Sequence, residues 1–124
     1  MRLVIGGYAQ GKLSYVLRTY RLDEGQVVSS EMPEGTNKTV VFNHLHSWVK
    51  ERILAGGNPE RELETMIERW TDCILISDEI GNGIVPLEAG EREYRERLGR
   101  MLVEIAKRAE SVERVFCGIG QRIK

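Results

Sequence analysis

The chain is poor in the residues that mark several large classes of protein. Its 124 residues include 2 cysteines, 3 prolines and 2 histidines, and its basic and acidic residues nearly balance, at a net charge of −1. Cys73 and Cys117 lie far apart inside apolar runs and form no Cys-x-x-Cys pair, so we expect two buried free thiols and no disulfide framework. Without a basic excess there is no general attraction to nucleic acid, and we expect no nucleic-acid partner.

Long apolar runs and a leader segment are also missing. No run approaches the roughly 20 apolar residues of a membrane span. Residues 1–5 pass directly into glycines without a signal-peptide core, which predicts a cytoplasmic protein with no membrane partner. The composition, 41% hydrophobic and 30% charged, is that of a soluble globular protein, and the length predicts a single domain over residues 1–124.

Short apolar runs alternate along the chain with segments of helical periodicity. Runs of aliphatic or β-branched residues predict strands, and the amphipathic segments between them predict helices. Because strands that alternate with helices build parallel sheets covered on both faces, we predict an α/β fold, a three-layer sandwich of the phosphate-loop type with a mainly parallel sheet of about five strands. We expect strands at 3–5, 26–29, 39–42, 73–76 and 112–117, helices at 12–22, 46–54, 59–70 and 88–108, and a tail at 118–124.

The first loop has the spacing of a phosphate-binding motif. Residues 6–12 fit G-x-x-x-x-G-K between a predicted strand and a predicted helix. Glycines allow backbone N–H groups to turn toward phosphate oxygens, and the helix N-terminus and Lys12 add positive charge. The alternative is an ordinary glycine-rich turn. The motif predicts a nucleotide-binding loop made of Gly6, Gly7, Tyr8, Ala9, Gln10, Gly11, Lys12 and Leu13.

One position of this motif departs from the pattern. The residue after the lysine is normally a serine or threonine whose hydroxyl holds Mg²⁺, and here it is Leu13. Ser14 comes next, but it is rotated by roughly 100° around the helix and should point elsewhere. Binding of ATP or GTP through the loop needs no hydroxyl, whereas Mg²⁺-dependent phosphoryl transfer loses one of its usual ligands.

Several segments together resemble one enzyme family. Residues 76–86 resemble the N-E-V-G-x-G-I-V-P motif of the bifunctional adenosylcobinamide kinase / adenosylcobinamide-phosphate guanylyltransferases of cobalamin biosynthesis. Residues 92–99 resemble that family's R-x-F-R-D-x-x-G, residues 118–124 its V-x-G-I-x-x-x-I-K ending, and residues 6–12 its G-G-A-R-S-G-K-S loop. The resemblance implies an enzyme that uses ATP or GTP on a corrinoid such as adenosylcobinamide, and a homo-oligomer such as the family's trimer.

The middle of the chain departs from that family's pattern. Residues 41–48 resemble its strand-end motif V-D-C-L-T-x-W, but Asn43 replaces the acidic residue and His46 replaces the threonine. In the family, a long segment before this strand carries the histidine that becomes guanylylated. Residues 30–38 are short and contain no histidine, which argues against guanylyl transfer.

Two carboxylates follow the most apolar predicted strand, at the edge of the sheet where ligands bind. Glu79 matches the glutamate of the family motif, and with Lys12 it is our candidate catalytic pair. Asp78 stands where the motif has asparagine. Two interpretations stay open for Asp78: it anchors Mg²⁺ in place of the carboxylate missing at Asn43, or it caps neighbouring backbone N–H groups.

The two histidines stand close together in the sequence. If residues 39–46 are extended, His44 and His46 point to the same side of the strand. A His-x-His pair needs a third ligand to bind zinc, and none is evident nearby. We assign Asn43 and His44 to the nucleotide-binding edge, and His46 is an alternative nucleophile for nucleotidyl transfer. We favour the simpler interpretation of both histidines as partly buried polar residues at the sheet edge.

Two classes of function therefore stay open. The first is a compact enzyme of the resembled family, in which Lys12 stabilises the transferring phosphoryl group. The second is a degenerate relative that binds a nucleotide or corrinoid without turnover and serves as a sensor, carrier or assembly subunit. Leu13 and Asn43 favour the second class, while the glycine-rich loop favours a ligand site in both.

Overall fold

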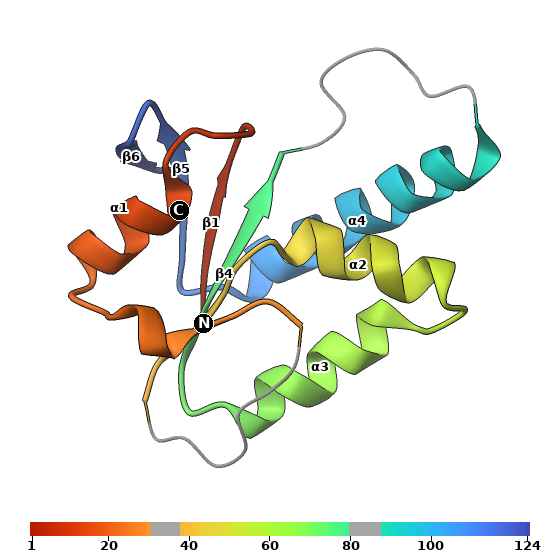
Figure 1. Ribbon diagram of the computed structural model, residues 1–124, viewed down its shortest axis with the longest axis horizontal. Helices are drawn as coiled ribbons and strands as arrows, with labels where there is room; N and C mark the ends of the chain where they lie inside the picture. Colours follow the sequence, from red (N-terminus) through yellow and green to blue (C-terminus); the bar gives the residue numbers. More distant parts are fainter. Residues whose placement is uncertain (31–37, 80–87) are drawn as a thin grey trace.

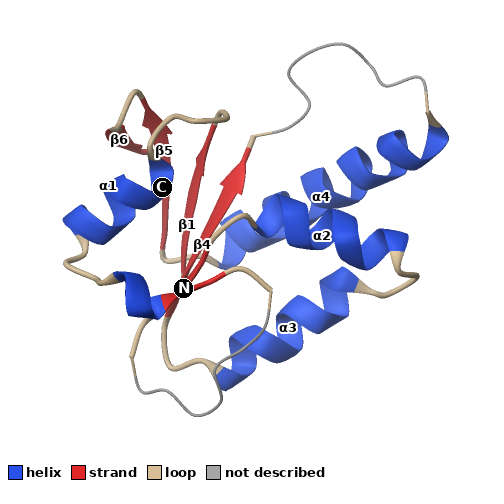
Figure 2. Cartoon of the chain, in the orientation of Figure 1, coloured by secondary structure: helices blue, strands red, loops and turns tan. Residues whose placement is uncertain are grey.

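The structure is a computed structural model that describes residues 1–30, 38–79 and 88–124. Strands and helices are interspersed along these residues, with one short 3-10 helix at Glu24–Gln26. Figures 1 and 2 show a sheet with helices on both of its faces. The strands are β1 (Arg2–Gly6), β2 (Val27–Val28), β3 (Val40–Phe42), β4 (Cys73–Asp78), β5 (Ser111–Phe116) and β6 (Ile119–Arg122), and the helices are α1 (Lys12–Thr19), α2 (Leu45–Leu54), α3 (Pro59–Arg69) and α4 (Ala89–Arg108).

The strands form one sheet in the order β2-β3-β4-β1-β5-β6. All neighbours pair in parallel except β5 and β6, which are antiparallel. The predicted α/β fold with a mainly parallel sheet is therefore confirmed. The expected tail at 118–124 is wrong, because Cys117 and Gly118 have φ values of 50° and 75° and form a tight turn. Two consecutive residues with positive φ make the kind of turn that closes a hairpin, so the end of the chain becomes β6.

Helix α1 covers one face of the sheet, and α2, α3 and α4 cover the other (Figure 1). Alternate residues along each strand face opposite layers, so Val4 and Ile74 pack with Val16 of α1, while Leu3 and Leu75 pack in the other layer. Phe42 anchors this second layer, with its ring centroid 5.6 Å from Trp48 and 6.0 Å from Trp70. These contacts give the predicted three layers.

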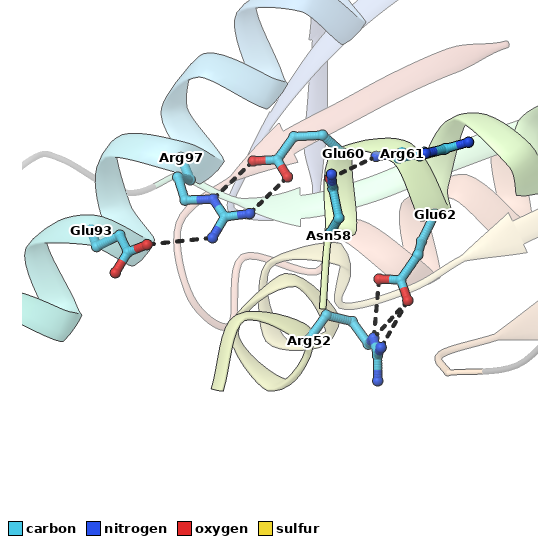
Figure 3. Close-up of polar contacts among 7 residues, drawn as sticks. All are labelled: Arg52, Asn58, Glu60, Arg61, Glu62, Glu93 and Arg97. Carbon is cyan, nitrogen blue, oxygen red and sulfur yellow. Dashed lines mark hydrogen bonds and ion pairs between the residues drawn. The ribbon is translucent and has the colours of Figure 1, made fainter. Parts of the chain in front are cut away.

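Polar contacts fix the helices to one another on the surface (Figure 3). Asn58 caps α3, since its Oδ1 accepts a hydrogen bond from the Arg61 N–H at 3.1 Å. Arg97 of α4 reaches Glu60 of α3 through two N–H···O bonds of 2.9 Å. None of the described helices is both long and apolar enough to cross a membrane.

The two cysteines differ in their surroundings. Cys73 is buried in β4, as expected, and burial raises the pKa of its thiol to about 11. The expectation of a second buried thiol is wrong, because Cys117 is exposed. It stands at the tip of the β5–β6 turn, where no layer covers the sheet.

The strand register positions the candidate site. Gly6, the last residue of β1, pairs with Asp78 on one side and with Val115 on the other. Three central parallel strands therefore end at the same level. The loop after β1, the start of α2 and the end of β4 meet at this carboxyl edge, which lies at the top of Figure 1.

Candidate functional site

The loop of residues 7–11 joins β1 to α1 at the carboxyl edge. Gly11 has φ 82° and precedes the first residue of α1, Lys12. A side chain at Gly6 would place its Cβ 2.5 Å from the Val115 carbonyl oxygen, so the close approach of β1 and β5 requires glycine there. Tyr8 at the loop tip is 86% exposed. The structure thus places the loop between a strand and a helix, the context that a phosphate-binding motif needs.

The Lys12 side chain folds back into the loop and is 9% exposed. Its Nζ donates to the Gly7 carbonyl oxygen at 2.7 Å and lies 2.7 Å from Asp78 Oδ1. The ammonium group therefore has a carbonyl on one side and a carboxylate on the other. The sequence places Lys12 and Asp78 in two separate motifs, and the β1–β4 pairing brings them together.

His46 holds Asp78 from the opposite side. The backbone N–H of Asp78 donates to His46 Nδ1 at 3.0 Å, so this nitrogen is an unprotonated acceptor. In the neutral ring the proton is then on Nε2, which lies 3.4 Å from Asp78 Oδ2. Burial lowers the pKa of His46, with further lowering by the charges of His44 and Lys12 and an opposing effect of Asp78. His46 thus binds the Asp78 backbone through Nδ1, and its Nε2 lies near the Asp78 carboxylate.

The chain after β3 is not extended as far as His46, which was the condition for placing the two histidines on one side of a strand. Strand β3 ends at Phe42, and His44 has φ 57° and immediately precedes α2. The premise of two histidines on one strand side is therefore wrong, because a helix begins between them. His44 is exposed rather than partly buried, and its ring meets that of half-buried His46 edge to face, with 5.6 Å between centroids.

Asn43 is held by a backbone hydrogen bond, and Leu13 packs against the core. The Asn43 N–H donates to the Val28 carbonyl oxygen at 2.8 Å, which ties this loop to β2. Leu13 packs against the apolar cluster beneath α1, and Ser14 is exposed. Neither side chain of α1 next to Lys12 thus offers a hydroxyl to the site.

A magnesium ion of the kind the motif normally holds does not fit these residues. Leu13 lacks the oxygen, Asn43 lacks the charge, and the Asp78 carboxylate is already bonded to Lys12. Across the described parts of the chain, no three His, Cys, Asp or Glu side chains come close enough together to hold a metal ion. We therefore derive no metal-dependent step.

Glu79 contacts a partner that sequence reasoning missed. Its carboxylate pairs with Arg114 of β5, at 2.7 Å to Nε and 3.1 Å to Nη2, rather than with Lys12. Its backbone N–H donates to the Gly6 carbonyl oxygen at 2.8 Å. Glu79 thus bridges the end of β1, which lies between β4 and β5. Nothing in the sequence signals this pairing, because the two residues are distant in the chain and meet only through the strand order.

The β5–β6 hairpin braces the loop from the other side. Gln10 accepts two hydrogen bonds of 2.8 Å, from the Cys117 N–H to its side chain and from the Gly118 N–H to its carbonyl oxygen. Lys124 fixes the base of the hairpin, because its Nζ donates to the Ala109 carbonyl oxygen at 2.6 Å and to two further carbonyls at the end of α4. The terminal segment singled out by its motif therefore supports the loop structurally.

The Gly-Ile-Val-Pro part of the motif over 76–86 lies outside the described residues. Only its first part is placed, as the end of β4 with Asp78 and Glu79. The described site therefore consists of the β1–α1 loop, the start of α2 and the end of β4. It brings together Lys12, Asp78 and His46, and it holds Glu79 against β5.

Comparisons with known proteins support the resemblance carried by the motifs. A family model described as cobinamide kinase / cobinamide phosphate guanyltransferase matches residues 17–123, a range that begins after the β1–α1 loop. The bifunctional adenosylcobalamin biosynthesis protein CobU of Escherichia coli K12 is 34% identical over 67 residues, which cover 51% of this chain and 37% of that protein. The protein of the same name from Salmonella typhimurium LT2 gives the same figures. The matched stretch thus spans little more than a third of these curated relatives. By the extent of the family match, this chain belongs to the cobinamide kinase / cobinamide phosphate guanyltransferase family.

Proposed function

We propose that this chain binds ATP or GTP through residues 6–13 and acts in cobalamin biosynthesis, with a corrinoid such as adenosylcobinamide as the second ligand. The observation that carries the proposal is the buried Lys12 ammonium at the head of α1, folded back into the loop that joins the helix to β1. A lysine in that place contacts the phosphates of a bound nucleotide as a full positive charge. Family membership supports the corrinoid.

The surroundings of Lys12 suit an anionic ligand. The loop ends in Gly11, whose left-handed conformation opens α1, and the first turn of α1 contains no acidic residue. The N-terminus of a helix carries partial positive charge and free N–H groups, which favour phosphate oxygens. We assign Lys12 to neutralise charge on the phosphates, Glu79 to the catalytic edge beside it, and Asn43 and His44 to the part of the nucleotide nearest α2.

A binding titration tests this function. The purified protein is titrated calorimetrically with ATP and with GTP, in EDTA and in Mg²⁺, and then assayed for phosphorylation of adenosylcobinamide. Lys12→Met should weaken nucleotide binding at least tenfold, since it removes a charge-assisted contact worth about 1.5–3 kcal/mol. The matched control is Lys107→Met, which removes an exposed lysine of α4 far from the loop. Absence of nucleotide binding by the wild-type protein would refute the proposal.

A second candidate function is binding without turnover, as a sensor, carrier or assembly subunit. Leu13 favours this function. It stands at the position where the motif normally has a metal-binding hydroxyl, and its side chain packs into the core instead. The same titration separates the two functions. Nucleotide binding that is indifferent to Mg²⁺, with no phosphorylated corrinoid, supports the second function, and turnover supports the first.

Guanylyl transfer through His46 is not part of the proposed function. A nucleophilic nitrogen must be free to attack the α-phosphate in line, whereas Nδ1 of His46 accepts the Asp78 N–H and Nε2 carries the proton of the neutral ring. Incubation with labelled GTP should leave no acid-labile adduct on His44 or His46. We further propose a cytoplasmic homo-oligomer, with the trimer as the form to test by sedimentation equilibrium.

A further inference from the structure

The carboxylate of Asp78 stands where a phosphate group would have to meet Lys12. The distance from Lys12 Nζ to Asp78 Oδ1 is 2.7 Å, and the two side chains are only 9% and 18% exposed. An ion pair with so little contact with water is weakly screened, so it competes strongly with any other partner of either group. A phosphate that approaches the loop therefore finds the lysine already neutralised.

We propose that Asp78 is a built-in counter-ion of Lys12, which an incoming phosphate group must displace, and that Asp78 thereby limits the phosphate affinity of this loop. The inference rests on the proposed function, because it takes residues 6–13 as the phosphate site. It goes further in naming Asp78 as the residue that sets affinity and His46 as the residue that positions Asp78.

Several contacts keep Asp78 in this position. Its backbone belongs to β4 and pairs with Gly6, and its N–H is bound by His46 Nδ1 at 3.0 Å. Its second carboxylate oxygen, Oδ2, faces His46 Nε2 at 3.4 Å. The carboxylate thus has one oxygen on Lys12 and the other toward the imidazole. When Lys12 turns to a phosphate, Asp78 loses its cation and remains beside the ligand with a negative charge, and both effects weaken binding.

The neighbouring carboxylate provides a natural comparison. Glu79 carries the same charge one residue further along, but its partner is Arg114, whose side chain is 50% exposed. A phosphate at Lys12 need not separate that pair. General repulsion of an anion should therefore respond to removal of either charge, whereas displacement of a counter-ion should respond to removal of Asp78 alone.

The test uses inorganic tripolyphosphate in EDTA, a probe that carries neither a base nor a metal ion. Asp78→Asn keeps the shape of the side chain, and it should bind tripolyphosphate about tenfold more tightly than the wild type, as expected for removal of a competing buried charge. Glu79→Gln should give a clearly smaller gain, and Asp72→Asn, the same substitution just before the start of β4, where Asp72 pairs with Arg2, should change the affinity by less than about twofold. Equal affinities of Asp78→Asn and wild type, or an equal gain in Glu79→Gln, would overturn the inference. Circular dichroism checks that each variant is folded.

The positioning role of His46 has its own test. His46→Ala should tighten tripolyphosphate binding severalfold in the wild-type background, because Asp78 loses the contact that holds it beside Lys12. The same substitution should have no effect on affinity in the Asp78→Asn background. A merely structural histidine would lower the melting temperature in both backgrounds and leave the affinity unchanged in both, which would overturn this role.

A ligand-free measurement separates failure of this inference from failure of the proposed function. The melting temperatures of Lys12→Met, Asp78→Asn and the double variant form a cycle, and the two single losses should not add, because they remove the same ion pair. Additive losses would overturn the inference whether or not a ligand binds. If the cycle shows coupling but neither wild type nor Asp78→Asn binds tripolyphosphate or nucleotide, the proposed function and the inference built on it both fail.

Discussion

The carboxyl edge of the sheet and the helical layer of α2, α3 and α4 each contain an ion pair, and the two pairs differ in their exposure to water. In the helical layer, Arg97 binds Glu60 bidentately on the surface, with the glutamate side chain 42% exposed (Figure 3). At the carboxyl edge, Lys12 binds Asp78 with both side chains largely out of water. Water screens the first pair and leaves the second strong. The Arg97–Glu60 pair therefore orients the helices and adds little stability. The Lys12–Asp78 pair is a strong interaction at the edge where we propose that a phosphate group displaces Asp78.

The largest expected effect concerns Gly6, the last residue of β1, which lies beneath the candidate site. Gly6→Ala should destabilise the fold by about 2–4 kcal/mol, because its Cβ would meet the Val115 carbonyl and the two central strands would have to separate. Gly7→Ala is the matched control, since its nearest atom is Gln10 Cγ at 3.5 Å, and its stability should change by less than about 1 kcal/mol. Urea denaturation measures both values. Similar losses in the two variants would show that the edge does not depend on the close approach of β1 and β5.

The contact between the hairpin and the loop is expected to have a smaller effect. Gln10→Ala removes the side-chain acceptor of the Cys117 N–H and should weaken ATP or GTP binding about fivefold, the equivalent of one hydrogen bond that holds the loop. Because the Gly118 contact uses the Gln10 backbone, it persists in the variant. An unchanged nucleotide affinity, with an unchanged melting temperature, would mean that the loop keeps its shape without the hairpin.

The helical layer should respond less than the site. Arg97→Met should cost about 0.2–1 kcal/mol in the free energy of unfolding, as surface ion pairs do, and should leave nucleotide affinity unchanged. Glu60→Gln should cost a similar amount, because the two residues form one bidentate pair. Chemical denaturation measures the free energy of unfolding of each variant, and a nucleotide titration measures its affinity. A shift in nucleotide affinity would show that the two regions are coupled.

The smallest effect expected is in the pH dependence of stability. The folded protein lowers the pKa of His46 below its ordinary value of 6.5, chiefly by burial, so the unfolded chain binds a proton at this residue more readily. Stability attributable to His46 should therefore be full at neutral pH and decline as the pH falls below about 6.5 toward the folded-state pKa. The difference in unfolding free energy between wild type and His46→Gln, followed from pH 8 to 5, isolates this residue. A difference that grows as the pH falls, in favour of the wild type, would contradict it.

The sequence predicted the central strands and most of the helices well, for a physical reason. Runs such as Cys73–Ile76 are apolar enough that only burial on both faces of a sheet accommodates them, and Asn58-Pro59 starts a helix by local capping. The hairpin was missed because its turn depends on Cys117 in a left-handed conformation, which no propensity indicates for cysteine. The strand at 39–42 and the helix after it were predicted close to their observed bounds, but the two histidines do not share a strand, because α2 begins at Leu45, whose apolar side chain is buried in the core.

The candidate site was predicted in its parts rather than in its contacts. The spacing of residues 6–12 and the carboxylates Asp78 and Glu79 correctly predicted which loops lie at the carboxyl edge. The pairing of Lys12 with Asp78, and of Glu79 with Arg114, could not be predicted, because it depends on β1 lying between β4 and β5. Strand order is a property of the whole sheet, and local sequence does not encode it.

By itself, the sequence determined the alternation of strands and helices, the glycine-rich loop with its lysine, the absence of a hydroxyl after that lysine, and the motifs of the family. These features are local, since each depends on residue types within a few positions of one another. Only the tertiary structure decided which groups meet at the edge: that Asp78 neutralises Lys12, that His46 Nδ1 binds the Asp78 backbone, and that the hairpin braces Gln10. Those contacts join residues distant in the chain, and they form because parallel strands paired in register end at one level of the sheet.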